Sequence, residues 1–124
     1  MTSITTLSRR ADVRAAQLSF YKRLESIVDN IVAIQQVPAP TFNEEQRARF
    51  VQERFHQAGL QDVSRDSLNN VFGKLAGSDK TKPPLVITAH LDTVFPMETD
   101  LAVRREGKFI YGQGIGDNST GVAG

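Results

Sequence analysis

The apolar residues in the first part of the chain recur with the period of an α-helix. One helix is predicted from about residue 10 to residue 36, with a stripe that ends on a polar residue: Leu24, Ile27, Val28, Ile31 and Gln35. Pro38 and Pro40 follow this stripe. They end the helix because proline lacks the amide hydrogen and disfavours the α region in the residue before it.

A second helix is predicted to begin at Thr41. Thr41 and Glu44 have the spacing of a capping box, in which each side chain bonds to the backbone of the other residue. Gly59 stands where a left-handed residue is expected to end the helix. The two helices are expected to pack as an outer layer, and the second has an apolar face made of Ala48, Val51, Phe55 and Ala58.

The pattern changes to short strands after residue 60. Residues 61–64 and 70–76 are predicted strands, separated by the polar turn 66–69. Residues 103–111 indicate a second hairpin, with its turn at Gly107.

The most apolar strand is predicted at residues 85–89. Its sequence, Leu-Val-Ile-Thr-Ala, is short, rich in β-branched residues and preceded by two prolines, which is typical of a strand buried on both faces. A glycine-rich loop at 112–121 then leads into the start of another element at Val122. Helices and strands in this order predict an α/β fold.

The length of 124 residues allows one domain with its own core. With 15 Lys+Arg against 14 Asp+Glu, the net charge of +1 gives no electrostatic case for a nucleic-acid partner. The chain has no cysteine, so a metal site would consist of His, Asp and Glu. No secretory signal is expected, because no apolar region follows Arg9 and Arg10. No apolar run in the sequence approaches the roughly 18 residues that cross a membrane. We therefore expect a cytoplasmic protein that binds neither nucleic acid nor membrane.

The first candidate for chemistry is the pair His90 and Asp92, directly after the predicted strand 85–89. Ligands of open α/β sheets bind beyond the carboxyl ends of the strands. In extended backbone, residues two apart point to the same side, so the carboxylate could orient the histidine or bind a metal with it. By itself, a histidine at a strand end is more often an ordinary polar group.

The second candidate is Asp117 in the glycine-rich loop. Glycines let the backbone approach an ion closely, although an aspartate in a turn is commonly structural. A dinucleotide-binding loop is disfavoured, because G-x-G-x-x-G fails from both Gly112 and Gly114, and no P-loop lysine is present. Ser119 lacks the G-x-S-x-G context of a hydrolase nucleophile.

Together, the two motifs resemble the M20 family of zinc-dependent peptidases and amidohydrolases. The resemblance rests on residues 89–96 (Ala-His-Leu-Asp-Thr-Val-Phe-Pro) and 111–121 (Tyr-Gly-Gln-Gly-Ile-Gly-Asp-Asn-Ser-Thr-Gly). It extends over essentially the whole chain, since the helices and the Asn-Val-Phe-Gly-Lys strand at 70–74 come in the expected order.

The resemblance implies a role for each matched residue. His90 would bind the first zinc ion, Asp92 would be the active-site aspartate that supports His90, and Asp117 would bridge two zinc ions. Cobalt or manganese could replace zinc at such a site. The peptide bond after the bridging aspartate is often cis in the family, so a cis bond is expected between Asp117 and Asn118.

The resemblance also implies what lies outside the chain. The family's general-base glutamate, its later ligands and its dimerisation domain have no counterpart in residues 1–124. These residues are expected to form the N-terminal part of a partial three-layer α/β/α catalytic domain, inactive alone. The whole enzyme would cleave a small peptide or an N-acyl amino acid by metal-activated water, as a homodimer in one reading.

Three possibilities for the function remain open: a particular branch of the M20 family, a related family, and a protein that is not an enzyme. The Gly-Asp-Asn-Ser-Thr-Gly form of the loop favours the aminopeptidase T-like branch, and hence a tripeptide aminopeptidase. The related M28 aminopeptidases share a His-x-Asp motif and a glycine-rich aspartate loop. Finally, a chain with only two matched ligands, His90 and Asp117, could be a non-catalytic metal-binding module.

Overall fold

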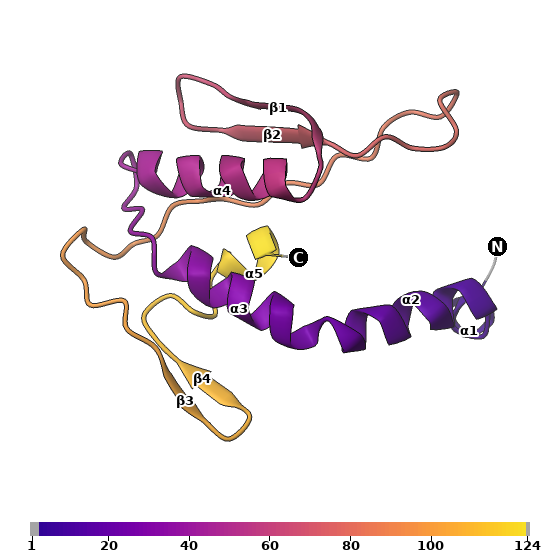
Figure 1. Ribbon diagram of the computed structural model, residues 1–124, viewed down its shortest axis with the longest axis horizontal. Helices are drawn as coiled ribbons and strands as arrows, with labels where there is room; N and C mark the ends of the chain where they lie inside the picture. The colour runs from indigo at the N-terminus through magenta and orange to yellow at the C-terminus, as the bar shows by residue number, and fades with distance from the viewer. Residues whose placement is uncertain (1–2, 124) are drawn as a thin grey trace.

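The computed structural model describes residues 3–123, and Figure 1 shows how its helices and two hairpins are arranged. The elements in chain order are α1 (Ile4–Ser8), α2 (Ala11–Lys22), α3 (Leu24–Gln35), α4 (Glu45–Gln57), β1 (Gln61–Arg65), β2 (Val71–Lys74), β3 (Arg104–Glu106), β4 (Phe109–Tyr111) and α5 (Ser119–Ala123). Among the described residues, no helix is long and apolar enough to cross a membrane.

The long first helix predicted for residues 10–36 is divided in two. The backbone leaves helical geometry at Arg23, with φ −102° and ψ 4°, and α3 begins at the next residue. Figure 1 shows α2, with α1 at its far end, extending away from the rest of the molecule. Helix α2 has no buried residue, whereas α3 buries Ile34 and Gln35 near its end. The apolar stripe therefore marks α3 correctly, but it did not reveal the break.

The capping box predicted for the second helix is wrong. Helix α4 begins at Glu45, and its N-cap residue Glu44 makes no side-chain cap bond. The Glu44 carboxylate instead accepts from the backbone N–H of Phe42 at 2.6 Å, while the Thr41 hydroxyl donates to Asp92 at 2.8 Å. The cap is absent because the helix begins later than predicted: its N-cap is Glu44, so Thr41 lies three residues before the cap position. The end of the helix is as predicted, since Gly59 has φ 75°.

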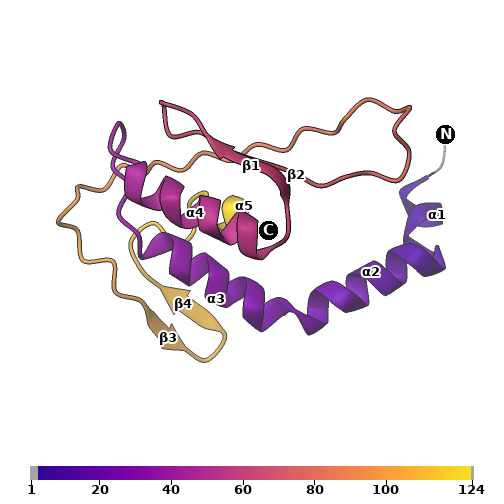
Figure 2. The same cartoon turned by 45° about the horizontal axis from the view of Figure 1, so that its top comes forward.

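The two predicted hairpins are confirmed. Strands β1 and β2 pair antiparallel with an irregular register, and Figure 2 shows this hairpin alongside α4. Gly73 allows the close approach, because a Cβ there would lie 2.8 Å from side-chain atoms of Leu60 and Phe55. Strands β3 and β4 pair in regular antiparallel register, with Gly107 at φ 56° in the turn between them. This second hairpin is tied to α3 by an ion pair between Arg105 and Asp29 at 2.7 Å.

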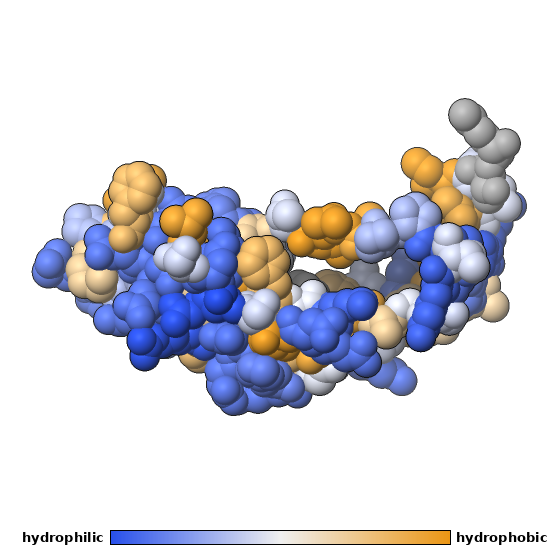
Figure 3. All heavy atoms as spheres, turned by 90° about the horizontal axis from the view of Figure 1, so that it is seen from above, coloured by the Kyte–Doolittle hydropathy of each residue, from blue (hydrophilic) through white to orange (hydrophobic). Residues whose placement is uncertain are grey.

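The prediction of a strand buried on both faces at residues 85–89 is wrong. These residues belong to no strand, and Leu85, Val86 and Ile87 are 86%, 75% and 85% exposed. Seen from above, the molecule shows hydrophobic groups at its surface beside an opening through its middle (Figure 3). A buried strand needs backbone partners on both sides. The part of the chain that the structure describes pairs its strands only within the two hairpins.

The fold is therefore a mixture of helices and small antiparallel sheets, consistent with part of an α/β domain. The three-layer arrangement expected from the family resemblance is not seen in residues 3–123. The core is small and lies where α3 and α4 meet the segments that follow them. Its buried apolar residues are Ile34, Ala39, Ala48 and Val51, and its buried polar residues are Gln35, Arg47, Thr93 and Ser119.

Candidate metal site

His90 and Asp92 lie at the end of the extended segment, where the chain returns to the core. Thr93 fixes that point, since its backbone N–H donates to the Ala39 carbonyl at 2.7 Å in an isolated parallel bridge between Pro40 and Thr93. Thr93 is buried, which places the two preceding motif residues at the edge of the core. The segment after α3 thus sets the position of the His-x-Asp motif.

The ring of His90 faces a carboxylate on each side. Its Nδ1 lies 3.2 Å from Oδ1 of Asp92 and 3.0 Å from the Asp92 carbonyl oxygen. Its Nε2 lies 3.4 Å from Oδ1 of Asp117. The structure thereby brings together the three residues that the sequence singled out, and all three side chains remain partly open to solvent.

The glycine-rich loop presents Asp117 through a series of turns. Gly114 has φ 71° and lies against the Phe95 ring, so only glycine suits this position. The backbone N–H of Asp117 donates to the Gly114 carbonyl at 3.1 Å, and that of Asn118 donates to Oδ1 of Asp117 at 2.8 Å. The side chain of Asn118 then donates to the His90 carbonyl at 3.0 Å, which joins the two motifs directly.

The cis peptide bond expected after Asp117 is not present. No peptide bond among the described residues is cis, so the Asp117–Asn118 bond is trans. The orientation of the carboxylate is accounted for by the turn hydrogen bonds alone.

Hydrogen bonding favours the charged form of Asp92. The Thr41 hydroxyl is the main cause of a lowered Asp92 pKa, with a further contribution from His90, and partial desolvation opposes both. An ionised Asp92 carboxylate accepts a hydrogen bond from a protonated Nδ1 of His90. This favours the tautomer in which Nε2 carries the free lone pair. Thr41 was read from the sequence as a helix cap, so its contact with Asp92 was missed.

Arg47 lies behind the site, in the core, and was not identified from the sequence. It is 3% exposed, and its guanidinium donates to the carbonyls of Val37 at 2.9 Å and Leu91 at 2.7 Å. Burial lowers the pKa of Arg47, and the charges of Asp117 and Asp92 oppose that effect. A signal was available, because Arg47 falls one turn before Val51, on the apolar face of α4, where a charged residue is unusual.

The donor set fits a zinc ion in chemistry and in spacing. Two ligand atoms bound tetrahedrally at about 2.0–2.1 Å are about 3.4 Å apart, and Nε2 of His90 lies 3.4 Å from Oδ1 of Asp117. A direct charge-assisted hydrogen bond would be shorter, at about 2.7–2.9 Å. Within residues 3–123, however, no group of three His, Cys, Asp or Glu side chains is placed to hold a metal ion. His90 and Asp117 therefore fit two of the ligands of a zinc ion, and the described residues do not provide a third.

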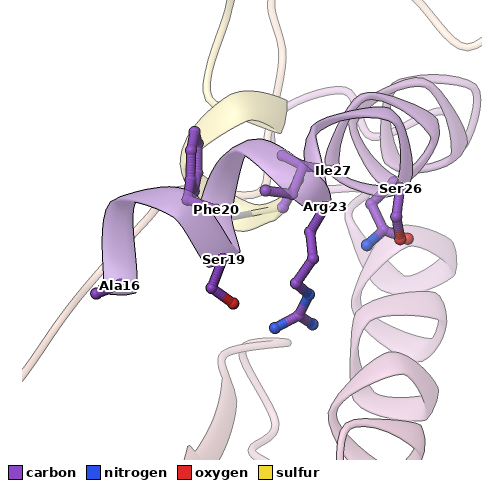
Figure 4. A pocket seen from close by; sticks show the side chains of 8 residues that line it. Ala16, Ser19, Phe20, Arg23, Ser26 and Ile27 are labelled. Carbon is purple, nitrogen blue, oxygen red and sulfur yellow. The ribbon is translucent and has the colours of Figure 1, made fainter. Parts of the chain in front are cut away.

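A pocket lies elsewhere, where α2 and α3 meet (Figure 4). It encloses about 340 Å³ and includes Phe20, Arg23 and Ile27, but none of the three motif residues. It does not form part of the candidate site.

Comparison with known proteins supports a metallopeptidase-type hydrolase. Residues 70–124 match the model of peptidase family M28, and this range contains His90, Asp92 and Asp117. M28 is a metallopeptidase family related to M20. The comparison does not single out M20, the family that the motifs resemble. No curated protein matches the chain.

Proposed function

We propose that this chain carries part of the metal site of a hydrolase that cleaves a peptide or amide bond in a small substrate. One observation carries the proposal: the imidazole of His90 lies between two carboxylates, with Nδ1 toward Asp92 and Nε2 at 3.4 Å from Asp117. The match of residues 70–124 to peptidase family M28 supports the same class of reaction.

In this proposal, His90 and Asp117 bind zinc, and Asp92 holds the His90 ring in the tautomer whose Nε2 is free. Asp117 would be shared by two zinc ions, and cobalt or manganese could substitute for zinc. The bound metal would activate water and polarise the scissile carbonyl. The part played by this chain is to fix the donor atoms, through the turn that holds Asp117 and through the Thr41–Asp92 contact.

The branch of the enzyme group is a finer proposal. The Gly-Asp-Asn-Ser-Thr-Gly sequence at 116–121 favours an M20 enzyme of the aminopeptidase T-like kind, acting on tripeptides, whereas the family match favours M28. A small peptide or an N-acyl amino acid would be the substrate in either case. A homodimer, with residues 1–124 as the N-terminal part of the catalytic domain, belongs to the M20 version of the proposal.

A non-catalytic metal-binding module is the second candidate. It is favoured by the convergence of only two donor side chains, His90 and Asp117, in the part of the chain that the structure describes. Such a module would bind zinc through the same atoms, but it would not hydrolyse peptides in any context.

Two measurements separate these proposals. The protein expressed from its complete reading frame is assayed for zinc content and for hydrolysis of tripeptides and N-acyl amino acids. We expect His90→Ala to remove most activity and to lower the zinc content, while His56→Ala, at the other histidine, changes neither. Zinc bound without any hydrolysis would favour the module, and unchanged zinc content in His90→Ala would refute the ligand assignment.

A further inference from the structure

Two buried polar side chains contact the two segments that carry His90 and Asp117. Gln35, the last residue of α3, is 1% exposed, and Arg47 of α4 is 3% exposed. Long polar side chains are rarely buried this fully, and burying them is unfavourable unless their donors are satisfied. Here the donors of both side chains are directed at backbone carbonyls: those of Leu91 and Gln113 in the two motif segments, those of Gln35 and Val37 at the end of α3, and that of Leu101. The amide oxygen of Gln35 has no hydrogen-bond partner among the described residues.

Arg47 holds the His-x-Asp segment. Its Nη1 donates to the Leu91 carbonyl at 2.7 Å, and Leu91 is the residue between His90 and Asp92. Its Nε donates to the Val37 carbonyl at 2.9 Å, so the same planar group links this segment to the end of α3. A guanidinium presents its donors in a fixed fork, and its contacts therefore set the positions of both carbonyls at once.

Gln35 holds the glycine-rich loop. Its amide nitrogen donates to the Gln113 carbonyl at 2.7 Å and to the Leu101 carbonyl at 3.1 Å. Gln113 directly precedes Gly114, whose carbonyl accepts from the Asp117 backbone N–H. The Gln35 side chain thus fixes the base of the turn that presents the Asp117 carboxylate.

The two contacts are joined to each other, because Nη2 of Arg47 donates to the Gln35 carbonyl at 3.4 Å. We propose that Arg47 and Gln35 are positioning residues that together set the separation between His90 and Asp117. The inference rests on the proposed function, because the distance between His90 and Asp117 affects metal binding only if both residues are ligands. The contacts themselves do not depend on it.

The positive charge of Arg47 could also affect metal binding at the site, so a test must separate this charge effect from positioning. Asp117 and Asp92 both attract the buried guanidinium, so removing it changes the electrostatics of the site as well as its geometry. Gln35→Met removes the two amide hydrogen bonds without changing charge. Arg47→Lys keeps the charge and loses the fork. Arg49→Met is the matched control, because Arg49 is exposed on the same helix and, among the described residues, its side chain bonds only to Glu45.

The first measurement needs no metal. Amide and imidazole NMR signals are recorded for each variant, with His56 as the internal reference. We expect Gln35→Met and Arg47→Lys to shift the signals of His90 and of the Asn118 side-chain amide, while Arg49→Met leaves them in place. Unshifted His90 and Asn118 signals in Gln35→Met would overturn the positioning role, whatever zinc does.

The second measurement is a titration with zinc chloride, and the visible spectrum of the cobalt-substituted chain reports the geometry of the donors. Outer-shell partners typically change metal affinity about 10–100-fold, and we expect a loss of at least about tenfold in Gln35→Met and in Arg47→Lys. Full affinity in Arg47→Lys would assign the effect to charge and overturn the proposal. Should the unaltered chain bind no zinc through His90, the proposed function would fail, while the NMR result would still decide the positioning.

Discussion

The Nε2 atom of His90 lies 3.4 Å from Oδ1 of Asp117, a separation that suits two ligands of one tetrahedral zinc ion. The two residues come from different segments, and the Asn118 side chain joins those segments by donating to the His90 carbonyl. The other ring nitrogen of His90 is occupied by Asp92. This arrangement leads to predictions about the site and about the elements that support it.

Replacing Asp92 by asparagine should weaken zinc binding without unfolding the chain. Asparagine keeps the size of the side chain, but it loses the negative charge that favours a proton on Nδ1 of His90. The zinc dissociation constant is expected to rise about 10–100-fold. Asp100→Asn is the control, since the exposed Asp100 carboxylate accepts from the Ala102 backbone N–H and contacts none of the three motif residues. Equal affinities in the two variants would contradict the orienting role of Asp92.

Gly121→Ala should disturb His90 from a distance. A Cβ at Gly121 would collide with the Asn118 amide oxygen, so Asn118 must move and its bond to the His90 carbonyl is weakened. Loss of one such bond is worth about 1 kcal/mol, or about fivefold in zinc affinity. Gly116→Ala is the control, because a Cβ there meets no atom within 4 Å. The Asn118 side-chain amide signal reports the movement, and a signal that stays in place would be evidence against this prediction.

Gly73→Ala should destabilise the packing of the first hairpin on α4. The added methyl group would lie 2.8 Å from atoms of Leu60 and Phe55, which is overpacked. The expected cost is about 1–3 kcal/mol, measured from hydrogen exchange of the β1 and β2 amides. Gly77→Ala provides the comparison, since nothing lies near its Cβ position. If both variants exchange at the same rate, the close approach is not a constraint.

The turn between β1 and β2 should weaken in acid. The Asp66 carboxylate accepts from the Asn70 side chain, and from the backbone N–H groups of Asn70 and Leu68, and these bonds lower its pKa. A lowered pKa in the folded state means that the stabilisation is present above the ordinary pKa of aspartate, about 3.9. It is lost as the pH falls through the lower folded value. Carboxyl NMR of Asp66, followed with amide exchange of the turn, measures this, and Asp66→Asn should remove the pH dependence.

The sequence predicted the local elements well where one short stretch decides the structure. The helical stripe through Val28 and Ile31 marks α3, Gly59 is left-handed after α4 as expected, and Gly107 lies in the predicted hairpin turn. The polar turn before Asn70 and both hairpins also follow from local residue preferences. The three candidate site residues stay predictions; each stands in a short motif, and its role is what the family resemblance implies.

The features that the sequence did not reveal depend on distant partners. The capping box at Thr41 fails because α4 begins only at Glu45, and the Thr41 hydroxyl instead donates to the distant Asp92. The apolar segment at 85–89 has the composition of a buried strand, but burial requires neighbouring strands that residues 3–123 do not supply. Charged side chains mostly lie at the surface, yet backbone carbonyls from two segments hold Arg47 in the core. No local pattern contains these contacts.

The most direct test of the account is a zinc titration of the chain with the imidazole nitrogens of both histidines observed by NMR. We expect zinc to shift the Nε2 signal of His90 strongly and to leave the His56 signals unchanged. In Asp117→Asn, the shift at His90 should be lost. Saturation without any change at His90, or an undiminished change at His90 in Asp117→Asn, would contradict a metal site formed by these two residues.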